Sequence, residues 1–148
     1  MTIDVTARTV IDRPREEVAA YVIDHRNDPA WIGGISKSEL LGDGPLSEGS
    51  RVRRVASFLG SRIEYVNEVV RMDPGSVLEM RSVKSPFPMK ITYTFRDAPG
   101  GTEASVRVQG RPGGLYRIGG PMMKRAVQRS IDRDVATLKH TLEAPGPS

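Results

Sequence analysis

The central part of the chain is a succession of short segments in which apolar and polar residues alternate, each followed closely by a turn sequence. Six such segments predict β-strands at residues 35–41, 50–58, 62–72, 77–83, 89–97 and 102–110. The separators, at 42–45, 59–61, 73–75, 85–88 and 98–101, contain glycine or proline, as turns do. A crossover between parallel strands needs about a dozen residues or more. These connections are shorter, so the segments predict an antiparallel meander.

The residues before the meander predict one further strand and two short helices. Residues 2–11 alternate in the same way and predict a half-buried strand. Asp12-Arg13-Pro14 is typical of a helix start, and Asn27-Asp28-Pro29 repeats the signal. The second short helix carries Trp31 and should end at Gly33-Gly34. With the first strand the sheet has about seven strands, a number that tends to curl.

The last part of the chain predicts one long helix. Its pattern covers residues 115–143, and Gly119-Gly120-Pro121 interrupts it, so we expect either a bend there or a main helix that starts at Pro121. Residues 144–148 should form a frayed tail. A lone helix must bury its apolar side, and the concave face of the curled sheet is the only partner large enough. The chain therefore predicts an α+β fold with a single domain over residues 1–143.

One charged residue interrupts the apolar side of this helix. At 100° per residue, Asp134 falls inside the sector formed by the apolar side chains Met123, Val127, Ile131, Val135, Leu138 and Leu142. Burial of a lone carboxylate is costly, so it should be paired or have a raised pKa. It could form a salt bridge with Arg81 or Arg107, or be exposed where the sheet curves away. Alternatively, it could be a polar anchor or proton acceptor that faces a cavity.

The charge of the chain does not by itself indicate a nucleic-acid-binding protein. The net charge is +4, but 22 basic and 18 acidic residues are interspersed along the sequence. The densest basic cluster, Arg51, Arg53 and Arg54, is short and lacks the interleaved aromatic residues of stacking binders. We interpret it as a solvated basic surface and expect no nucleic-acid partner.

Other classes of site and location are also disfavoured. The absence of cysteine excludes disulfides and thiolate catalysis. The two histidines, His25 and His140, have no ligand spacing, and the glycine-rich pieces lack a phosphate-binding pattern, so we expect neither a metal nor a cofactor. No apolar stretch approaches the roughly 20 residues of a membrane span, and no signal-peptide pattern is present. We expect a cytoplasmic protein, and the sequence leaves its oligomeric state open.

Several segments together resemble the SRPBCC superfamily of START-like helix-grip proteins, in particular its polyketide cyclase/dehydrase-like branch. The matching segments are residues 10–18, 21–24 with 28–31, 68–74, 91–95 and 138–143, in the same order along nearly the whole chain. This resemblance implies a β-α-α-β6-α helix-grip fold, in which a curved seven-stranded antiparallel sheet wraps around the C-terminal helix and leaves an internal cavity. It also implies binding of a lipid, sterol, polyketide, hormone or quinone, and in some members cyclisation, dehydration or hydrolysis.

The strand patterns suggest which side chains face such a cavity. On strand 62–72 the phase of Ile63, Tyr65, Asn67 and Val69 competes with that of Val66 and Val70, and we favour the former. Trp31 should pack on the rim of the sheet, where it could close over a ligand. The candidate ligand-binding residues are Trp31, Tyr65, Asn67, Leu78, Met80, Ile91, Tyr93, Phe95, Met123, Val127 and Asp134.

Three hypotheses for the function follow. The first is binding of a small hydrophobic ligand, lipid or polyketide-like, with Tyr65, Tyr93 and Asp134 as orienting groups. The alternative is a polyketide cyclase/dehydratase-type enzyme, in which Asp134 or a tyrosine transfers a proton; Asp134 is the one candidate catalytic carboxylate. A third, weaker hypothesis is an interaction protein whose basic face binds an acidic partner.

Overall fold

The fold was taken from a computed structural model, which describes residues 2–58, 60–85, 88–111 and 120–144. The elements are β1 (Ile3–Ile11), α1 (Arg15–Ile23), the 3-10 turn η1 (His25–Asn27), α2 (Asp28–Trp31), β2 (Ile35–Leu41), β3 (Arg51–Phe58), β4 (Ser61–Asp73), β5 (Val77–Lys84), β6 (Met89–Ala98), β7 (Gly101–Gly110) and α3 (Gly120–Glu143). Every predicted strand is present, with ends that differ by at most one residue. The predicted α+β class and order of elements are confirmed.

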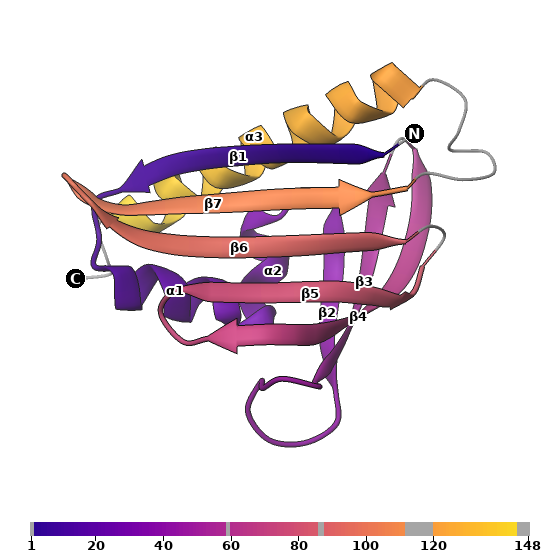
Figure 1. Ribbon diagram of the computed structural model, residues 1–148, viewed down its shortest axis with the longest axis horizontal. Helices are drawn as coiled ribbons and strands as arrows, with labels where there is room; N and C mark the ends of the chain where they lie inside the picture. Colours follow the sequence, from indigo (N-terminus) through magenta and orange to yellow (C-terminus); the bar gives the residue numbers. More distant parts are fainter. Residues whose placement is uncertain (1, 59, 86–87, 112–119, 145–148) are drawn as a thin grey trace.

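The seven strands form one antiparallel sheet in the order β1-β7-β6-β5-β4-β3-β2. Strands β2 to β7 follow one another as a meander, and β1 pairs with β7 at the far edge. Figure 1 shows how strongly the sheet curls: β5, β6, β7 and β1 run side by side, whereas β2 and β3 stand almost upright behind them. The pairing of β4 with β5 shifts register twice, between Val66 and Asn67 and between Val69 and Arg71, and such irregularities bend a strand.

Helix α3 lies along the concave side of the sheet, over β1 and β7, and its other neighbour is α2 (Figure 1). Its inner residues Met123, Ile131, Val135 and Leu138 are buried in the main core. Three of its polar side chains bind the β1 edge. Gln128 Nε2 donates to the Thr6 carbonyl at 3.0 Å, Lys139 Nζ donates to the Val10 carbonyl at 2.6 Å, and a Glu143 oxygen accepts from the Asp12 amide at 2.8 Å.

The two short helices close one end of the gap between sheet and helix. α1 follows directly after Pro14, and it buries Val18, Ala19 and Val22. Trp31, in α2, is only 2% exposed and packs edge-on against Tyr93 with ring centroids 5.9 Å apart. The prediction that Trp31 lies on the sheet rim is therefore wrong, because α2 turns its indole into the core.

The predictions at the start of the last helix and at the tail are only partly covered. α3 begins at Gly120, one residue before Pro121, which agrees with a main helix that starts at the glycine-proline sequence. The expected helical pattern over 115–119 and the frayed residues 145–148 lie outside the described residues.

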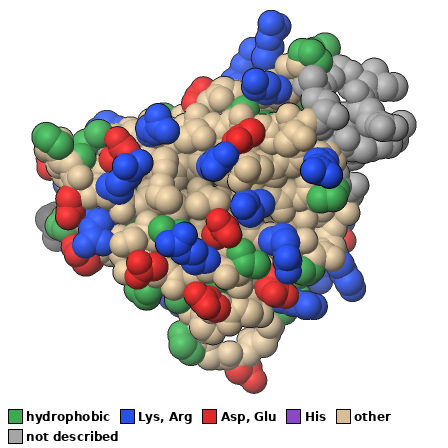
Figure 2. All heavy atoms as spheres, in the orientation of Figure 1, with side chains coloured by type: hydrophobic (Ala, Val, Ile, Leu, Met, Phe, Trp, Pro, Cys, Tyr) green, Lys and Arg blue, Asp and Glu red, His purple; other side chains and the backbone are tan. Residues whose placement is uncertain are grey.

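The outer face of the sheet carries both signs of charge. Figure 2 shows Lys and Arg side chains interspersed with Asp and Glu over this face, without a large patch of either sign. Cross-strand ion pairs account for part of this pattern, such as that of Arg107 with Asp4 at 2.6 Å. In the cluster that the sequence suggested, Arg53 pairs with Glu64, Arg51 pairs with Glu68, and Arg54 is buried at 3% exposure. The interpretation of this cluster as a solvated basic surface is therefore wrong for Arg54.

Candidate functional site

A cavity of about 150 Å³ lies between α3 and the concave face of the sheet. Its walls are largely apolar, with Ile63 from β4, Ile91 from β6, Val106 from β7 and Ile131 from α3. Trp31 and the residues that follow α2 line it as well. Alternation on the strands explains this lining, because every second residue of β4, β6 and β7 faces the helix.

The structure divides the eleven sequence-predicted site residues into two groups. Those that line the cavity are Trp31, Tyr65, Ile91, Tyr93, Val127 and Asp134. Those that are buried in the core but do not line the cavity are Asn67, Leu78, Met80, Phe95 and Met123. The inward phase of β4 is that of Tyr65, Asn67 and Val69, all of which are buried. A ligand-binding role for the first group stays a prediction.

A buried ion pair stands at the inner wall of the cavity. Arg54 on β3 and Asp28 at the start of α2 are 3% and 1% exposed, and the Asp28 Oδ2 atom lies 3.1 Å from Arg54 Nε and 2.9 Å from Nη2. The Ser38 hydroxyl donates to the same oxygen at 2.7 Å. Asp28 lies on the far side from the cavity, since Arg54 lines the cavity and Asp28 does not. The pair therefore places the guanidinium of Arg54, whose positive charge Asp28 balances, against the cavity wall.

This charge acts on two tyrosines. Arg54 Nη1 donates to the Tyr93 hydroxyl oxygen at 3.4 Å. Burial raises the pKa of Tyr93 to about 12 although the Arg54 charge opposes the increase, and burial raises the pKa of Tyr65 in the same way. Burial disfavours the charged form of Arg54, but Tyr93 and Asp28 together raise its pKa well above the ordinary value. Both tyrosines thus keep their protons near neutral pH, and a hydroxyl that accepts from Arg54 can donate its own hydrogen to a ligand oxygen.

Asp134 lies where the cavity meets the outside. Its side chain is 6% exposed, and Oδ1 accepts the Gly33 amide hydrogen at 2.8 Å. Burial raises the pKa of Asp134 to about 6, although the Gly33 amide and the Arg133 charge act in the opposite direction. The salt bridge considered with Arg81 or Arg107 is not present, because Arg107 pairs with Asp4 and no basic side chain in the described part of the chain forms an ion pair with Asp134. Asp134 is thus a partly desolvated carboxyl that changes charge close to physiological pH.

Within the described part of the chain, two other polar side chains are buried without hydrogen-bond partners. The indole nitrogen Nε1 of Trp31, which lines the cavity, has no acceptor among the described residues. The amide of Asn67, 0% exposed, likewise has no partner for either its nitrogen or its oxygen within the described residues. Unpaired buried donors are rare in native proteins, and a water molecule, an ion or a ligand can each pair with such a group. At the cavity wall, Trp31 offers one such donor to a ligand acceptor.

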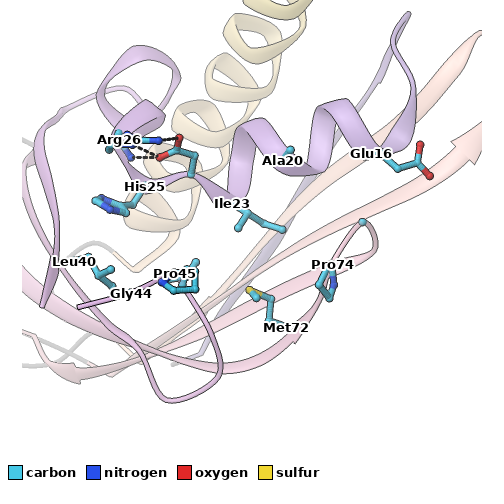
Figure 3. Close-up of a pocket in the computed structure, with 13 residues that line it drawn as sticks. Glu16, Ala20, Ile23, His25, Arg26, Leu40, Gly44, Pro45, Met72 and Pro74 are labelled. Carbon is cyan, nitrogen blue, oxygen red and sulfur yellow. Dashed lines mark hydrogen bonds and ion pairs between the residues drawn. The ribbon is translucent and has the colours of Figure 1, made fainter. Parts of the chain in front are cut away.

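A second, larger hollow of about 690 Å³ lies apart from the cavity beneath α3. It is bounded by α1, η1, the loop after β2 and the turn after β4, and it shares no lining residue with the cavity. In Figure 3, Ala20 and Ile23 of α1 lie across the hollow from Met72 and Pro74. Its His25 ring nitrogen lies 3.4 Å from the Ser38 carbonyl. We place the candidate site in the smaller cavity because buried polar groups converge there.

Arg54 and Asp28 are functional candidates that the sequence analysis missed. A usable signal was present for Arg54, since it alternates with Val52 and Ala56, and this phase of β3 points inward. Asp28 was interpreted as part of a helix start and of a segment that resembles the family, and not as a site residue. Its buried role depends on Arg54, which is 26 residues away in the chain.

The described residues contain no group of three or more potential metal-ligating side chains. None of the helices described is long and apolar enough to cross a membrane.

Comparisons with known proteins find a matching sequence family and solved structures with the same fold. Residues 2–143 match the sequence profile of the family described as polyketide cyclase/dehydrase and lipid transport. No curated protein matches the chain by sequence. Solved structures with the same fold include the Zhui aromatase/cyclase from Streptomyces sp. R1128, with 16% identity, a TM-score of 0.81, and coverage of 97% of this chain and 94% of that one.

Two further solved structures have the same fold. A START superfamily protein from Mycobacterium smegmatis has 15% identity and a TM-score of 0.78, with 96% and 97% of the two chains covered. A Thermus thermophilus protein has 20% identity and a TM-score of 0.74, with 95% and 94% covered. At these identities the likeness shows the fold, and it confirms the helix-grip architecture that the sequence resemblance implied.

Proposed function

The chain belongs to the polyketide cyclase/dehydrase and lipid-transport family, and from that premise we propose that it binds a small hydrophobic, oxygen-bearing molecule of lipid or polyketide type beneath α3. The observation that carries the proposal is the apolar cavity with polar groups at fixed points of its wall. Tyr93 and Tyr65 supply hydroxyls backed by the Arg54 charge, and Trp31 supplies an unpaired N–H. A mostly apolar hollow with a few convergent polar groups is typical of small-molecule sites.

The chemistry of these groups favours a ligand with an acceptor oxygen at its buried end. A pure hydrocarbon would leave the Trp31 N–H unpaired and the tyrosine hydroxyls without an acceptor, which costs free energy in a desolvated site. A ketone, ester, quinone or phenol oxygen would satisfy them. The aromatase/cyclase name of the Streptomyces neighbour supports a polyketide-like ligand of this kind.

Native mass spectrometry after mild purification, followed by a thermal-shift screen of lipids and polyketides, tests this proposal. Val108→Trp should fill the cavity, which Val108 lines, and should abolish both the co-purified mass and the thermal shift. Val83→Trp is the matched control, because Val83 is 37% exposed and lies outside the cavity lining, and it should keep both. Circular dichroism establishes that each variant folds, and Val127→Phe fills the same cavity from α3 if Val108→Trp does not. Equal ligand binding by a folded cavity-filling variant would contradict the proposal.

A second candidate function is favoured by Asp134, the one carboxyl among the described residues that line the cavity. With a pKa of about 6, it can accept and return a proton near neutral pH. In a cyclisation, its carboxylate would remove a proton from the carbon between two ketones of a poly-β-ketone. The Tyr93 and Tyr65 hydroxyls would stabilise the enolate oxygen that forms. The enolate carbon would then bond to another carbonyl carbon, and the resulting alkoxide would take up the proton before water leaves.

The enzyme hypothesis is tested with Asp134→Asn and a synthetic poly-β-ketone thioester. The wild type should convert the thioester to a product that has lost water, which mass spectrometry detects. Asp134→Asn should bind the thioester but form product no faster than buffer alone, because an amide cannot accept the proton. Unchanged product formation by Asp134→Asn would exclude the proton-transfer role.

A further inference from the structure

An open groove of about 450 Å³ adjoins the cavity along α3. The groove and the cavity share four lining residues, Gly33, Ser57, Ser130 and Asp134. These four stand at the boundary between the two hollows, so a molecule that fills the cavity can extend into the groove without a change of fold.

The size of the cavity makes such an extension necessary for most ligands. An apolar cavity of roughly 150 Å³ accepts a molecule such as benzene, and typical ligand sites are about 300 Å³ or larger. The cavity beneath α3 has about 150 Å³ and the groove about 450 Å³. A lipid or polyketide whose inner part occupies the cavity therefore has to place its outer part in the groove.

The wall of the groove is positively charged. Arg129 and Arg133 stand one turn apart on α3 and both line it. Both are exposed, and neither forms an ion pair with any carboxylate among the described residues. Several sheet arginines, such as Arg53, Arg54 and Arg107, pair with carboxylates instead, whereas Arg129 and Arg133 remain available to an external anion.

Among the described residues, Asp134 is the one acidic residue that lines the groove, and it balances at most one of these two charges. Asp132, the neighbouring acid on α3, accepts from Gln128 at 3.0 Å and does not line the groove. Asp134 lines the groove, but its Oδ1 atom is engaged with the Gly33 amide. Like charges at i and i+4 oppose helix formation unless an anion lies between them. Two arginines against one partly desolvated carboxyl leave the groove with an excess of positive charge.

Building on the proposed function, we propose that the ligand is an amphipathic acid, whose apolar body fills the cavity and whose carboxylate binds Arg129 and Arg133 in the groove. Guanidinium groups suit this role, because each can donate two parallel hydrogen bonds to a carboxylate. The groove then selects for the anionic end of the molecule, while the cavity selects for its apolar end.

Decanoate and methyl decanoate separate these two contributions, because they share the alkyl chain and differ in the charge of the head. Trp31 is the only tryptophan of the chain and lines the cavity, so its fluorescence reports directly on occupancy. At pH 7.5 and low salt, decanoate should bind at least about tenfold more tightly than the ester. Added salt should narrow that difference, since it screens the exposed arginines.

The double variant Arg129→Gln/Arg133→Gln should bring the two affinities within about threefold of one another, with the ester affinity unchanged. Arg125→Gln is the matched control: it removes the same charge one turn earlier on α3, outside the groove lining, and should leave the preference intact. Equal binding of acid and ester by the wild type would overturn the inference while leaving cavity binding in place. A preference that survives in the double variant would overturn it as well. If neither compound alters Trp31 fluorescence or is seen by calorimetry, the inference is overturned, whereas the proposed function is judged by its own screen of lipids and polyketides.

Discussion

The Asp134 carboxyl couples the stability of the fold to pH, and Asp134→Asn should reveal this coupling. Burial raises the pKa of Asp134 from 3.8 to about 6. Between these two values the unfolded chain has lost the proton and the folded protein still holds it. The folded state is therefore favoured below about pH 4, and the advantage is lost as the pH rises through about 6.

The size of the effect follows from the two pKa values. A rise of the pKa from 3.8 to about 6 on folding lowers the free energy of unfolding at high pH by about 3 kcal/mol at most. The groove beside Asp134 admits solvent, which screens the charge, so about 1–2 kcal/mol is the expected cost of the ionised carboxylate. Asparagine keeps an oxygen that can accept the Gly33 amide hydrogen and carries no charge. Asp134→Asn should therefore be more stable than the wild type by about 1–2 kcal/mol at pH 8, and equal to it near pH 3.5.

Thermal denaturation followed by circular dichroism, at constant ionic strength between pH 3.5 and 8, measures this difference. At pH 8 the variant should melt about 3–6 °C above the wild type, given the usual entropy of unfolding for a domain of this size. Asp132→Asn is the control, because it removes an exposed carboxylate from the same helix and should stay within about 0.5 kcal/mol of the wild type. If the melting temperatures of Asp134→Asn and the wild type differ by the same amount at every pH, burial does not raise the pKa of this carboxyl, and the reasoning is refuted.

Three further outcomes are expected. Arg54→Met should lower the free energy of unfolding in urea by about 3–5 kcal/mol, because it leaves a 1%-exposed carboxylate without its partner, and a loss below about 1 kcal/mol would contradict the buried pair. Gly34→Ala should cost at least about 1 kcal/mol more than Gly44→Ala in the same assay: both glycines have positive φ, but only at Gly34 would the new Cβ lie 2.5 Å from a backbone oxygen. Decanoate should bind more tightly at pH 5.5 than at 7.5, since protonation removes the negative charge of Asp134 from the groove, and Asp134→Asn should abolish this difference in calorimetry.

The strands and the meander were predictable because their determinants are local. Alternation sets the faces of a strand, and short turns forbid crossovers, so neither depends on distant residues. The same holds for the phase of Asp134, which follows from the helical period alone. Its hydrogen bond to Gly33, 101 residues away in the chain, could not be inferred, because the period of a helix does not say which backbone amide faces it.

Arg54 shows where a local pattern was outweighed by composition. Three arginines within four residues suggested a solvated cluster, although the alternation with Val52 and Ala56 points Arg54 inward. A buried arginine is stable only with a carboxylate in reach, and that carboxylate, Asp28, comes from α2 by tertiary packing. Tertiary packing also explains why the sequence analysis misplaced Trp31, because the orientation of a four-residue helix is decided by the sheet against which it packs.

The contacts of α3 with β1 also bear on how copies of this protein behave at high concentration. An edge strand with free carbonyl groups is a template on which a second chain can add a strand, which begins aggregation. At this edge, Gln128 and Lys139 bind the carbonyl oxygens of Thr6 and Val10. At the opposite edge, β2 carries the charged side chains Lys37 and Glu39. The helix that closes the cavity thus also shields one edge of the sheet, so loss of its C-terminal turns would favour aggregation through β1 even where the cavity survives.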